Sequence, residues 1–280
     1  MKRLFLFAGY DSHGIVDDSI VYYVHELSKL GDIVLCMDSN CANSEINKVK
    51  KYVKYAIGIR HGEYDFGSYK RAYIWARDNL NLSNYDYVYM VNDSVYGPLY
   101  NLKPYLVHME NSHTDAFGIV ENPKHEHPHI QSWFIGMHKT VFLSDWFNKF
   151  ITSVTHQSNK GMITALYEHG FTRGINEHNG KWMCLYSVSG RGVYNNVKKL
   201  YHAKMPFIKK VAFTRHNGRL GPQIKYVLQH IDPKLNSAIL QNAQRVYGTD
   251  YVNKTLKQNT ISAFFNGVKY GIKKLLAGQL

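Results

Sequence analysis

Acidic residues are scarce in this chain of 280 residues. It carries 21 Asp and Glu against 34 Lys and Arg, which gives a formal net charge of +13. A positive excess of this size favours acidic partners such as nucleic acid, anionic lipid or a phosphorylated small molecule. The basic residues are spread along the chain, and no helix-turn-helix, zinc finger or RNP-like segment accompanies them, which argues against a nucleic-acid-binding protein.

Cysteine is also rare. The three cysteines, Cys36, Cys41 and Cys184, form neither a CxxC pair nor a Cys/His spacing that would close a tetrahedral zinc site. We therefore expect reduced thiols and a cytoplasmic location.

Long hydrophobic runs are absent as well. No stretch approaches the roughly 18 apolar residues of a membrane-spanning helix. The run LFLFAG after Arg3 is too short for the core of a signal peptide, so we predict a first strand there. Hydrophobic residues still make up 45% of the chain, and this length can bury a sizeable core. We expect a folded protein, either free in the cytoplasm or peripheral on the inner face of the cell membrane.

The first hundred residues alternate between strand and helix patterns. Strands are expected at 3–10, 32–39, 55–60 and 85–91, and helices at 17–31, 44–53 and 65–80. This alternation predicts an α/β fold with a mostly parallel central sheet and helices on both faces. Ligands bind such sheets at the carboxyl ends of the strands.

Shorter, mixed elements follow. We expect a helix at 102–110, strands at 115–121, 130–139 and 182–188, and helices at 144–154 and 161–180, with the strand at 130–139 running antiparallel. From about residue 200 the chain is basic and helical. The sequence has no internal repeat, and we predict one domain at 1–200 with a helical extension at 201–280.

Polar residues or glycines follow all four of the first strands. They are Gly9, Tyr10 and Asp11, then Asp38 and Ser39, then Arg60, His61 and Gly62, and finally Asn92, Asp93 and Ser94. In a parallel sheet these ends would converge on one crevice, and its carboxylates, together with Arg60, Lys70 and Arg71, would suit a nucleoside diphosphate or a divalent cation. The alternative is that these side chains only satisfy turn backbone.

The segment HGEYDFGSYKRA at 61–72 gives a second signal. Asp65 is placed to cap the following helix, and Gly67 and Ser68 would offer backbone N–H groups to an anion at the helix start. A plain helix cap and an anion site are compatible, so this segment alone leaves both open.

Several motifs occur together and in order. They are HGEYDFGSYKRA at 61–72, NDSVYGP at 92–98, HIQSWF at 129–134, YEHG at 167–170 and PFIKK at 206–210. With them the sequence resembles the rhamnan synthesis protein F family from about residue 4 to residue 215. The resemblance implies a single Rossmann-like domain with the A-type glycosyltransferase fold. It also implies transfer of a sugar, often rhamnose, from a nucleoside diphosphate sugar to a lipid-linked or growing bacterial surface polysaccharide, with inversion at the anomeric carbon.

The resemblance also implies roles for single residues. Asp93 matches the last carboxylate of a DxD motif, but Val91 replaces the first, so Asp93 would hold Mg²⁺ or Mn²⁺ with only diphosphate and water, or bind sugar hydroxyls directly. Asp38 would contact the nucleotide base, and thymidine diphosphate rhamnose is the donor suggested.

Glu168 matches the general base that catalyses transfer, and Asp115 and Glu121 are alternative candidates for this role. The residues expected to bind the donor are Gly9, Asp38, Asp65, Gly67, Lys70, Asn92, Asp93, Ser94, His129, Gln131 and Lys209. The missing carboxylate leaves a second hypothesis, a sugar-binding scaffold protein without catalysis.

Two further features have alternatives. His125, His127 and His129 alternate around Pro128 and could bind a metal, whereas His129 and Gln131 could instead bind the sugar or the acceptor. Near the end, apolar residues repeat at helical spacing and lysines lie elsewhere, which suits a helix on anionic lipid or, equally, one packed against protein. The apolar set is Ile261, Phe264, Phe265, Val268, Ile272, Leu275 and Leu276, and the lysines are Lys269, Lys273 and Lys274.

Overall fold

The computed structural model describes residues 1–123, 128–189 and 191–276, which form two compact units. Unit 1 contains residues 1–16, 23–93 and 102–190, and unit 2 contains residues 17–22, 94–101 and the chain from 191 onward. The expected domain boundary after residue 200 stays a prediction, because compact units need not fold independently.

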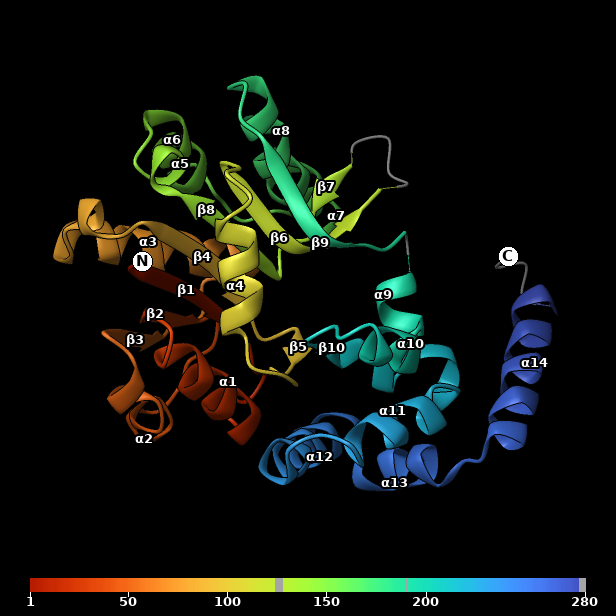
Figure 1. The fold of residues 1–280 in the computed structure, drawn as a ribbon. Helices are drawn as coiled ribbons and strands as arrows, with labels where there is room; N and C mark the ends of the chain where they lie inside the picture. The colour runs from red at the N-terminus through yellow and green to blue at the C-terminus, as the bar shows by residue number, and fades with distance from the viewer. Residues whose placement is uncertain (124–127, 190, 277–280) are drawn as a thin grey trace. The chain divides into compact units, whose positions relative to one another are not determined.

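Unit 1 is built on a mostly parallel sheet (Figure 1). Its strand order is β3-β2-β1-β4-β8-β6-β7, and β9 pairs with β6. The strands are β1 (Arg3–Gly9), β2 (Asp32–Met37), β3 (Tyr55–Gly58), β4 (Tyr87–Asn92), β6 (Ala116–Asn122), β7 (His129–Ile130), β8 (Phe134–His138) and β9 (Trp182–Ser187). Strands β1 to β4 are parallel, and β8 is antiparallel to β4 and β6. The expected α/β class and the antiparallel strand are confirmed.

The helices of unit 1 occur between its strands along the chain. They are α1 (Asp18–Ser28, which begins in unit 2), α2 (Asn43–Asn47), α3 (Tyr64–Asn79), α4 (Lys103–Glu110), α5 (Lys139–Phe142), α6 (Asp145–Thr152), α7 (Lys160–Ile163) and α8 (His169–Glu177). A π-helical turn, η3 (Thr164–Glu168), joins α7 to α8.

Two expected elements were wrong in extent. The helix expected at 44–53 is only α2 followed by a 3-10 turn at Lys50–Tyr52, because this lysine-rich segment buries Val49 alone and has no continuous apolar face. The strand expected at 130–139 is divided into β7 and β8 by a turn at residues 131–133, whose backbone is bound by a distant side chain, as described below.

The sheet is covered on both faces, as alternation along β1 shows. Leu4, Leu6 and Ala8 belong to a buried cluster that also contains residues of α3, α6 and α8. Phe5 and Phe7 point to the opposite face, where the Phe7 ring lies 5.3 Å from Tyr23 of α1. Side chains of a strand alternate between faces, so this pattern places helices on both sides of the sheet.

A buried ion pair joins the start of β1 to α4. The Arg3 guanidinium donates from Nε to Glu110 Oε1 at 2.5 Å and from Nη2 to Oε2 at 2.7 Å. The Tyr89 hydroxyl donates to Glu110 Oε1 at 2.5 Å. This bidentate geometry satisfies a carboxylate that has no access to solvent.

Unit 2 is mainly helical. Its short sheet pairs β5 (Val95–Tyr96) with β10 (Ile208–Lys209), and its helices are α9 (Gly192–Asn195), α10 (Val197–His202), α11 (Gly221–Leu228), α12 (Pro233–Tyr247), α13 (Thr249–Lys257) and α14 (Thr260–Leu276). Its core includes Tyr96, Phe213 and Ile239, and the Tyr96 hydroxyl donates to Asn242 Oδ1 at 2.5 Å.

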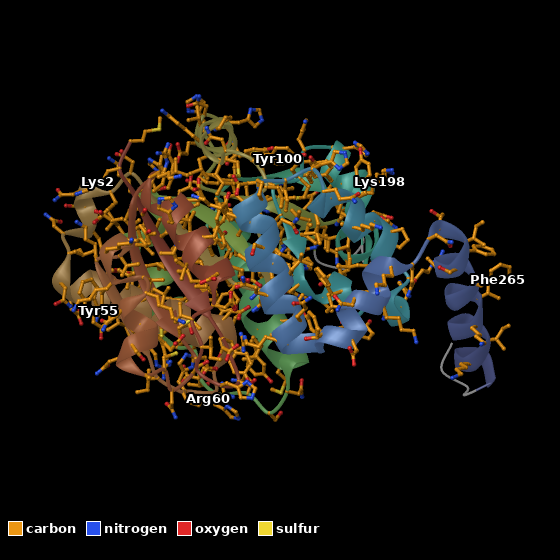
Figure 2. All side chains as sticks on the ribbon, turned by 90° about the horizontal axis from the view of Figure 1, so that it is seen from below. Lys2, Tyr55, Arg60, Tyr100, Lys198 and Phe265 are labelled. Atoms are coloured by element: carbon orange, nitrogen blue, oxygen red, sulfur yellow. The ribbon has the colours of Figure 1, made fainter. Side chains whose placement is uncertain are left out.

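The last helix exposes apolar side chains. Phe264 is 59% exposed and Phe265 is 65% exposed, and Phe265 projects from α14 in Figure 2. Ile261, Val268 and Ile272 are also exposed. Within residues 1–123, 128–189 and 191–276, no helix combines the length and the apolar character needed to cross a membrane.

Candidate active site

The polar residues after β1, β2 and β4 lie at one edge of the unit 1 sheet. Ala8 pairs with Asn92 and Gly9 with Met37, so the three strands end at the same level. The Asp38 N–H donates to Gly9 O at 2.8 Å, and the Asp93 N–H donates to Ala8 O at 3.1 Å. The structure therefore brings Gly9, Asp38 and Asp93 to adjacent positions on the carboxyl edge.

Asp38 holds the loop that follows β3. Its Oδ1 accepts from the backbone N–H groups of His61 at 2.7 Å and Gly62 at 2.9 Å, and its Oδ2 lies 2.7 Å from Arg60 Nη1. These bonds fix the loop against the end of β2. A role for Asp38 in recognising the base stays a prediction.

His61 is buried behind this loop. Its Nδ1 accepts from the Glu63 N–H at 3.1 Å, so in the neutral ring Nε2 carries the proton and donates to Ser68 Oγ at 3.0 Å. Burial lowers the pKa of His61 to about 4, against the opposing pull of the Asp38 carboxylate. The ring is therefore neutral near pH 7 and connects the loop to α3.

Asp65 lies beside the end of β4. Its Oδ2 accepts from Asn92 Nδ2 at 2.8 Å, which links α3 to the strand end that carries Asp93. The expectation that Asp65 caps the helix was wrong: α3 begins at Tyr64, whose φ is 58°, so Asp65 lies within the first turn. The Gly67 N–H is not free for an anion either, because it donates to Glu63 O at 3.2 Å.

Lys70 is held by protein groups. Its Nζ lies 2.7 Å from Glu63 Oε2 and donates to Val154 O at 2.6 Å, and the side chain is 15% exposed. Arg71 pairs with the same Glu63 oxygen at 2.7 Å. Neutralisation of a diphosphate by Lys70 stays a prediction, and it would require Lys70 to leave these contacts.

Glu168 binds the turn between β7 and β8. Its Oε2 accepts from the Ser132 hydroxyl and from the Ser132 N–H, the latter at 3.2 Å. Trp133 O, in the same turn, accepts from the Asn92 N–H at 3.2 Å. The turn therefore connects Glu168 to the strand end with Asp65 and Asp93, and all of these lie within unit 1.

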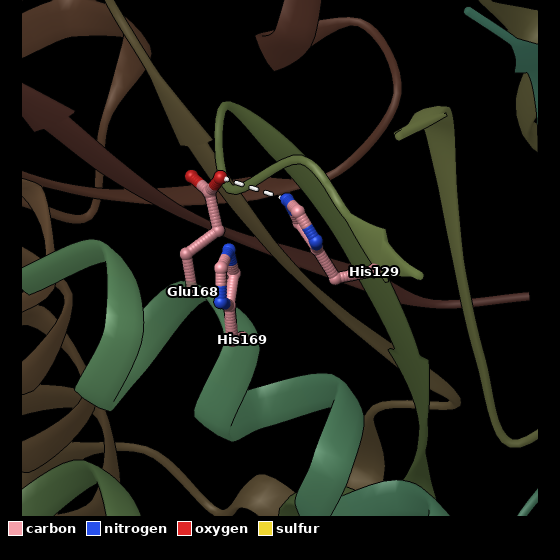
Figure 3. Close-up of side chains that lie close together, drawn as sticks. All are labelled: His129, Glu168 and His169. Atoms are coloured by element: carbon pink, nitrogen blue, oxygen red, sulfur yellow. Dashed lines mark ion pairs between the residues drawn. The ribbon is translucent and has the colours of Figure 1, made fainter. Parts of the chain in front are cut away.

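Two histidines accompany Glu168 (Figure 3). His129 Nε2 lies 3.4 Å from Glu168 Oε1, and the His129 and His169 ring centroids are 4.1 Å apart. Burial raises the pKa of Glu168, but the neighbouring His129 imidazole and the hydrogen bonds from Ser132 outweigh it, so the pKa lies below its ordinary value. The carboxylate is therefore ionised near neutral pH, which is the state that a proton acceptor needs.

His169 had no assigned role in the sequence, although it stands within the YEHG motif. It is the first residue of α8 and follows directly after the π-helical turn η3. Such turns occur frequently at functional sites and are not visible in residue spacing alone. Ser132 likewise stood in a motif without a role.

The other acids considered as bases lie at different places. Asp115 is at the amino end of β6, at the opposite edge of the sheet, where it accepts from the Lys181 N–H at 2.9 Å and from Thr140 Oγ1 at 3.2 Å. Glu121, near the carboxyl end of β6, pairs in register with Ile130. Gln131 Oε1 accepts from Trp133 Nε1 at 2.9 Å, which stabilises the turn.

Ser94 and Lys209 belong to unit 2. Lys209 Nζ donates to Ser94 Oγ at 2.9 Å, across the pairing of β10 with β5. Their part in donor binding stays a prediction.

The motif that contains Asp93 offers few further ligands for a metal ion. Val91, two residues earlier, is fully buried and offers no ligand. Mg²⁺ commonly takes one or two carboxylates plus substrate phosphates and water, so the residues present fit a cation that arrives with a diphosphate. Among the described residues, the one group of three or more metal-type ligands gathered within 4.8 Å is His129, Glu168 and His169. His125 and His127 lie outside the described residues.

The chain belongs to the rhamnan synthesis protein F family, whose model matches residues 33–270. This confirms the resemblance seen in the motifs and extends the match beyond residue 215. No curated protein sequence matches the chain significantly.

Solved structures resemble the fold loosely. A protein of Desulfovibrio desulfuricans G20, assigned as a nucleotide-diphospho-sugar transferase, is 16% identical, with a TM-score of 0.43 over 85% of this chain and 99% of its own. Staphylococcus aureus TarS (residues 1–349) is 11% identical, with a TM-score of 0.40 over 92% of this chain and 90% of its own. These TM-scores are below 0.5, so the similarity is too loose to transfer a function or a site.

Proposed function

We propose that the protein is a glycosyltransferase that moves a sugar from a nucleoside diphosphate sugar to a growing bacterial surface polysaccharide. Membership of a family named for rhamnan synthesis supports this proposal. The single observation that carries it is the turn at residues 131–133, which binds Glu168 through Ser132 and the β4 end through Trp133. A potential base and a potential donor-binding carboxylate thus share one edge of the sheet.

The donor would bind at the carboxyl edge. Asp93 would bind sugar hydroxyls or hold a divalent cation, and Asp38 would face the base. A bound Mg²⁺ or Mn²⁺ would supply positive charge that stabilises the departing diphosphate. The donor we propose is thymidine diphosphate rhamnose.

Glu168 would act on the acceptor. Its carboxylate would accept the proton of the acceptor hydroxyl while that oxygen forms its bond to the anomeric carbon. The bond from the anomeric carbon to the diphosphate would break at the same time, and the diphosphate would leave with the electron pair. A single displacement of this kind inverts the configuration at the anomeric carbon.

The helix α14 would bring the enzyme to a lipid-linked acceptor. Residues 260–276 contain no acid, and exposed Lys269 and Lys273 accompany the exposed apolar side chains. Such a helix suits the surface of an anionic membrane.

Sedimentation with anionic vesicles should recover the wild-type protein and much less of a Phe264→Ser/Phe265→Ser variant, while neutral vesicles should recover little of either. Equal recovery of both proteins on anionic vesicles would exclude α14 as the contact.

A second candidate function is a sugar-binding scaffold without catalysis. The buried Val91 in place of a metal-binding carboxylate favours it. Calorimetry with a panel of nucleoside diphosphate sugars, followed by chromatographic detection of product with a glycan acceptor, separates the two. Donor binding with product formation supports the transferase, and binding of glycan with no turnover of any donor supports the scaffold.

A further inference from the structure

We propose that His129, Glu168 and His169 form a binding site for Zn²⁺ or a chemically similar divalent transition metal. The three residues come from β7, the last position of η3 and the first position of α8. One ligand atom from each lies within 4.8 Å of the other two. Figure 3 shows the carboxylate and both imidazole rings facing a common space.

The distance between His129 and Glu168 fits two ligands of one ion. His129 Nε2 and Glu168 Oε1 are 3.4 Å apart. A direct charge-assisted hydrogen bond would be about 2.7–2.9 Å long. Two atoms that each lie about 2.1 Å from a tetrahedral Zn²⁺ are about 3.4 Å apart.

The ligand types favour zinc over magnesium. Two imidazoles and one carboxylate form a set that Zn²⁺ accepts readily, whereas Mg²⁺ prefers oxygen ligands. Three protein ligands would leave a fourth position for water or for a substrate oxygen. The site thus differs in chemistry from the cation site considered at Asp93.

The surroundings already fix the ligands. Glu168 Oε2 accepts two hydrogen bonds from Ser132, which leaves Oε1 directed at His129. Contacts of this kind orient metal ligands and strengthen binding. The His129 side chain is 4% exposed and that of Glu168 is 21% exposed, so an ion could enter from the Glu168 side.

Zinc binding would affect the proposed transfer reaction. A metal at Oε1 occupies the lone pair that would accept the acceptor proton, so Zn²⁺ should inhibit sugar transfer. This consequence rests on the proposed function, whereas the metal site itself does not.

The test is calorimetric titration of untagged, metal-free protein with ZnCl₂ and, separately, with MgCl₂. We expect one equivalent of Zn²⁺ to bind with micromolar or tighter affinity, and MgCl₂ to give no comparable binding. His169→Gln should weaken Zn²⁺ binding at least about tenfold, because it removes a direct ligand. His156→Gln is the matched control, since His156 is an exposed histidine that binds Gly62 O instead.

X-ray absorption of the zinc complex gives a second, independent readout, with two histidine nitrogens expected among the ligands. Absence of stoichiometric Zn²⁺ binding, or equal affinity of wild type and His169→Gln, would overturn the proposal. Circular dichroism establishes that the variant is folded, and if it is not, the absorption spectrum of the wild type decides alone. If Zn²⁺ binds but the zinc-free protein transfers no sugar, the proposed function is refuted and the metal site stands. If the zinc-free protein transfers sugar but Zn²⁺ does not bind, the metal site is refuted and the proposed function stands.

Discussion

Acidic side chains lie at both edges of the unit 1 sheet, but their surroundings differ. Toward the amino edge, Glu110 is buried in a bidentate pair with Arg3, and Asp115 binds groups beside it in the sheet. At the carboxyl edge, Asp65 accepts from a side chain of β4, and Glu168 accepts from a turn 36 residues earlier in the chain. Acids alone therefore do not mark a site. What distinguishes the carboxyl edge is its position, because ligands bind parallel sheets at the carboxyl ends of the strands.

The largest effect is expected from Asp93→Ala. Loss of this carboxylate should abolish donor binding or turnover, because Asp93 stands at the strand end where the diphosphate or sugar would bind. Donor calorimetry and product chromatography measure the two effects. Asp115→Ala, at the opposite edge, is the control and should keep activity. Full activity of Asp93→Ala would remove Asp93 from the site.

Glu110→Gln should damage the fold instead. It leaves the Arg3 charge buried without its partner, and breaking one side of a buried pair costs about 3–5 kcal/mol of unfolding free energy. Urea denaturation measures the loss. The double variant Arg3→Met/Glu110→Leu should lose less, because no unpaired charge remains. If Glu110→Gln is as stable as wild type, the pair between Arg3 and Glu110 does not contribute to the stability of the fold.

Glu168→Gln should lower the rate of transfer by about 10²-fold while donor binding is retained, since a general base contributes on that scale. The glutamine carbonyl can still accept from Ser132, so the turn should stay in place. Rates at saturating donor test this, with Asp115→Asn as the matched amide control. A similar loss in both variants would contradict the contrast between the two edges.

The sequence was sufficient for the elements with strong local patterns. Buried runs such as β1 and β4, bounded by turn residues, identified the parallel sheet, and their shared direction predicted which polar ends meet. It failed where a distant side chain decides the local structure. The turn at residues 131–133 interrupts a continuous strand pattern because Glu168 binds Ser132.

The same limit applies to the site. His169 gains its place from the π-helical turn before it, and the start of α3 at Tyr64 depends on a positive φ at a tyrosine, which residue type does not announce. Glu168, by contrast, was named from the family motif, and the structure puts it on the same edge as Asp65. Motifs thus identified single residues, while the neighbours of those residues required the fold.

The smallest effect concerns pH and tests whether the carboxyl edge also supports the fold. The folded-state pKa of His61 is about 4, below the ordinary value of 6.5, because the ring is buried. Between these values the unfolded chain binds a proton that the folded protein does not, so the free energy of unfolding should fall as the pH drops from 6.5 to 4. The expected loss of unfolding free energy is on the order of 2 kcal/mol at the acidic end of this range, and no loss from His61 is expected above pH 6.5. Urea denaturation at pH 7 and pH 4.5 should show a steeper loss for wild type than for His61→Gln, which has no titrating group there. Parallel pH dependence in the two proteins would mean that His61 becomes protonated without cost, and that the loop after β3 opens more easily than its hydrogen bonds to Asp38 indicate.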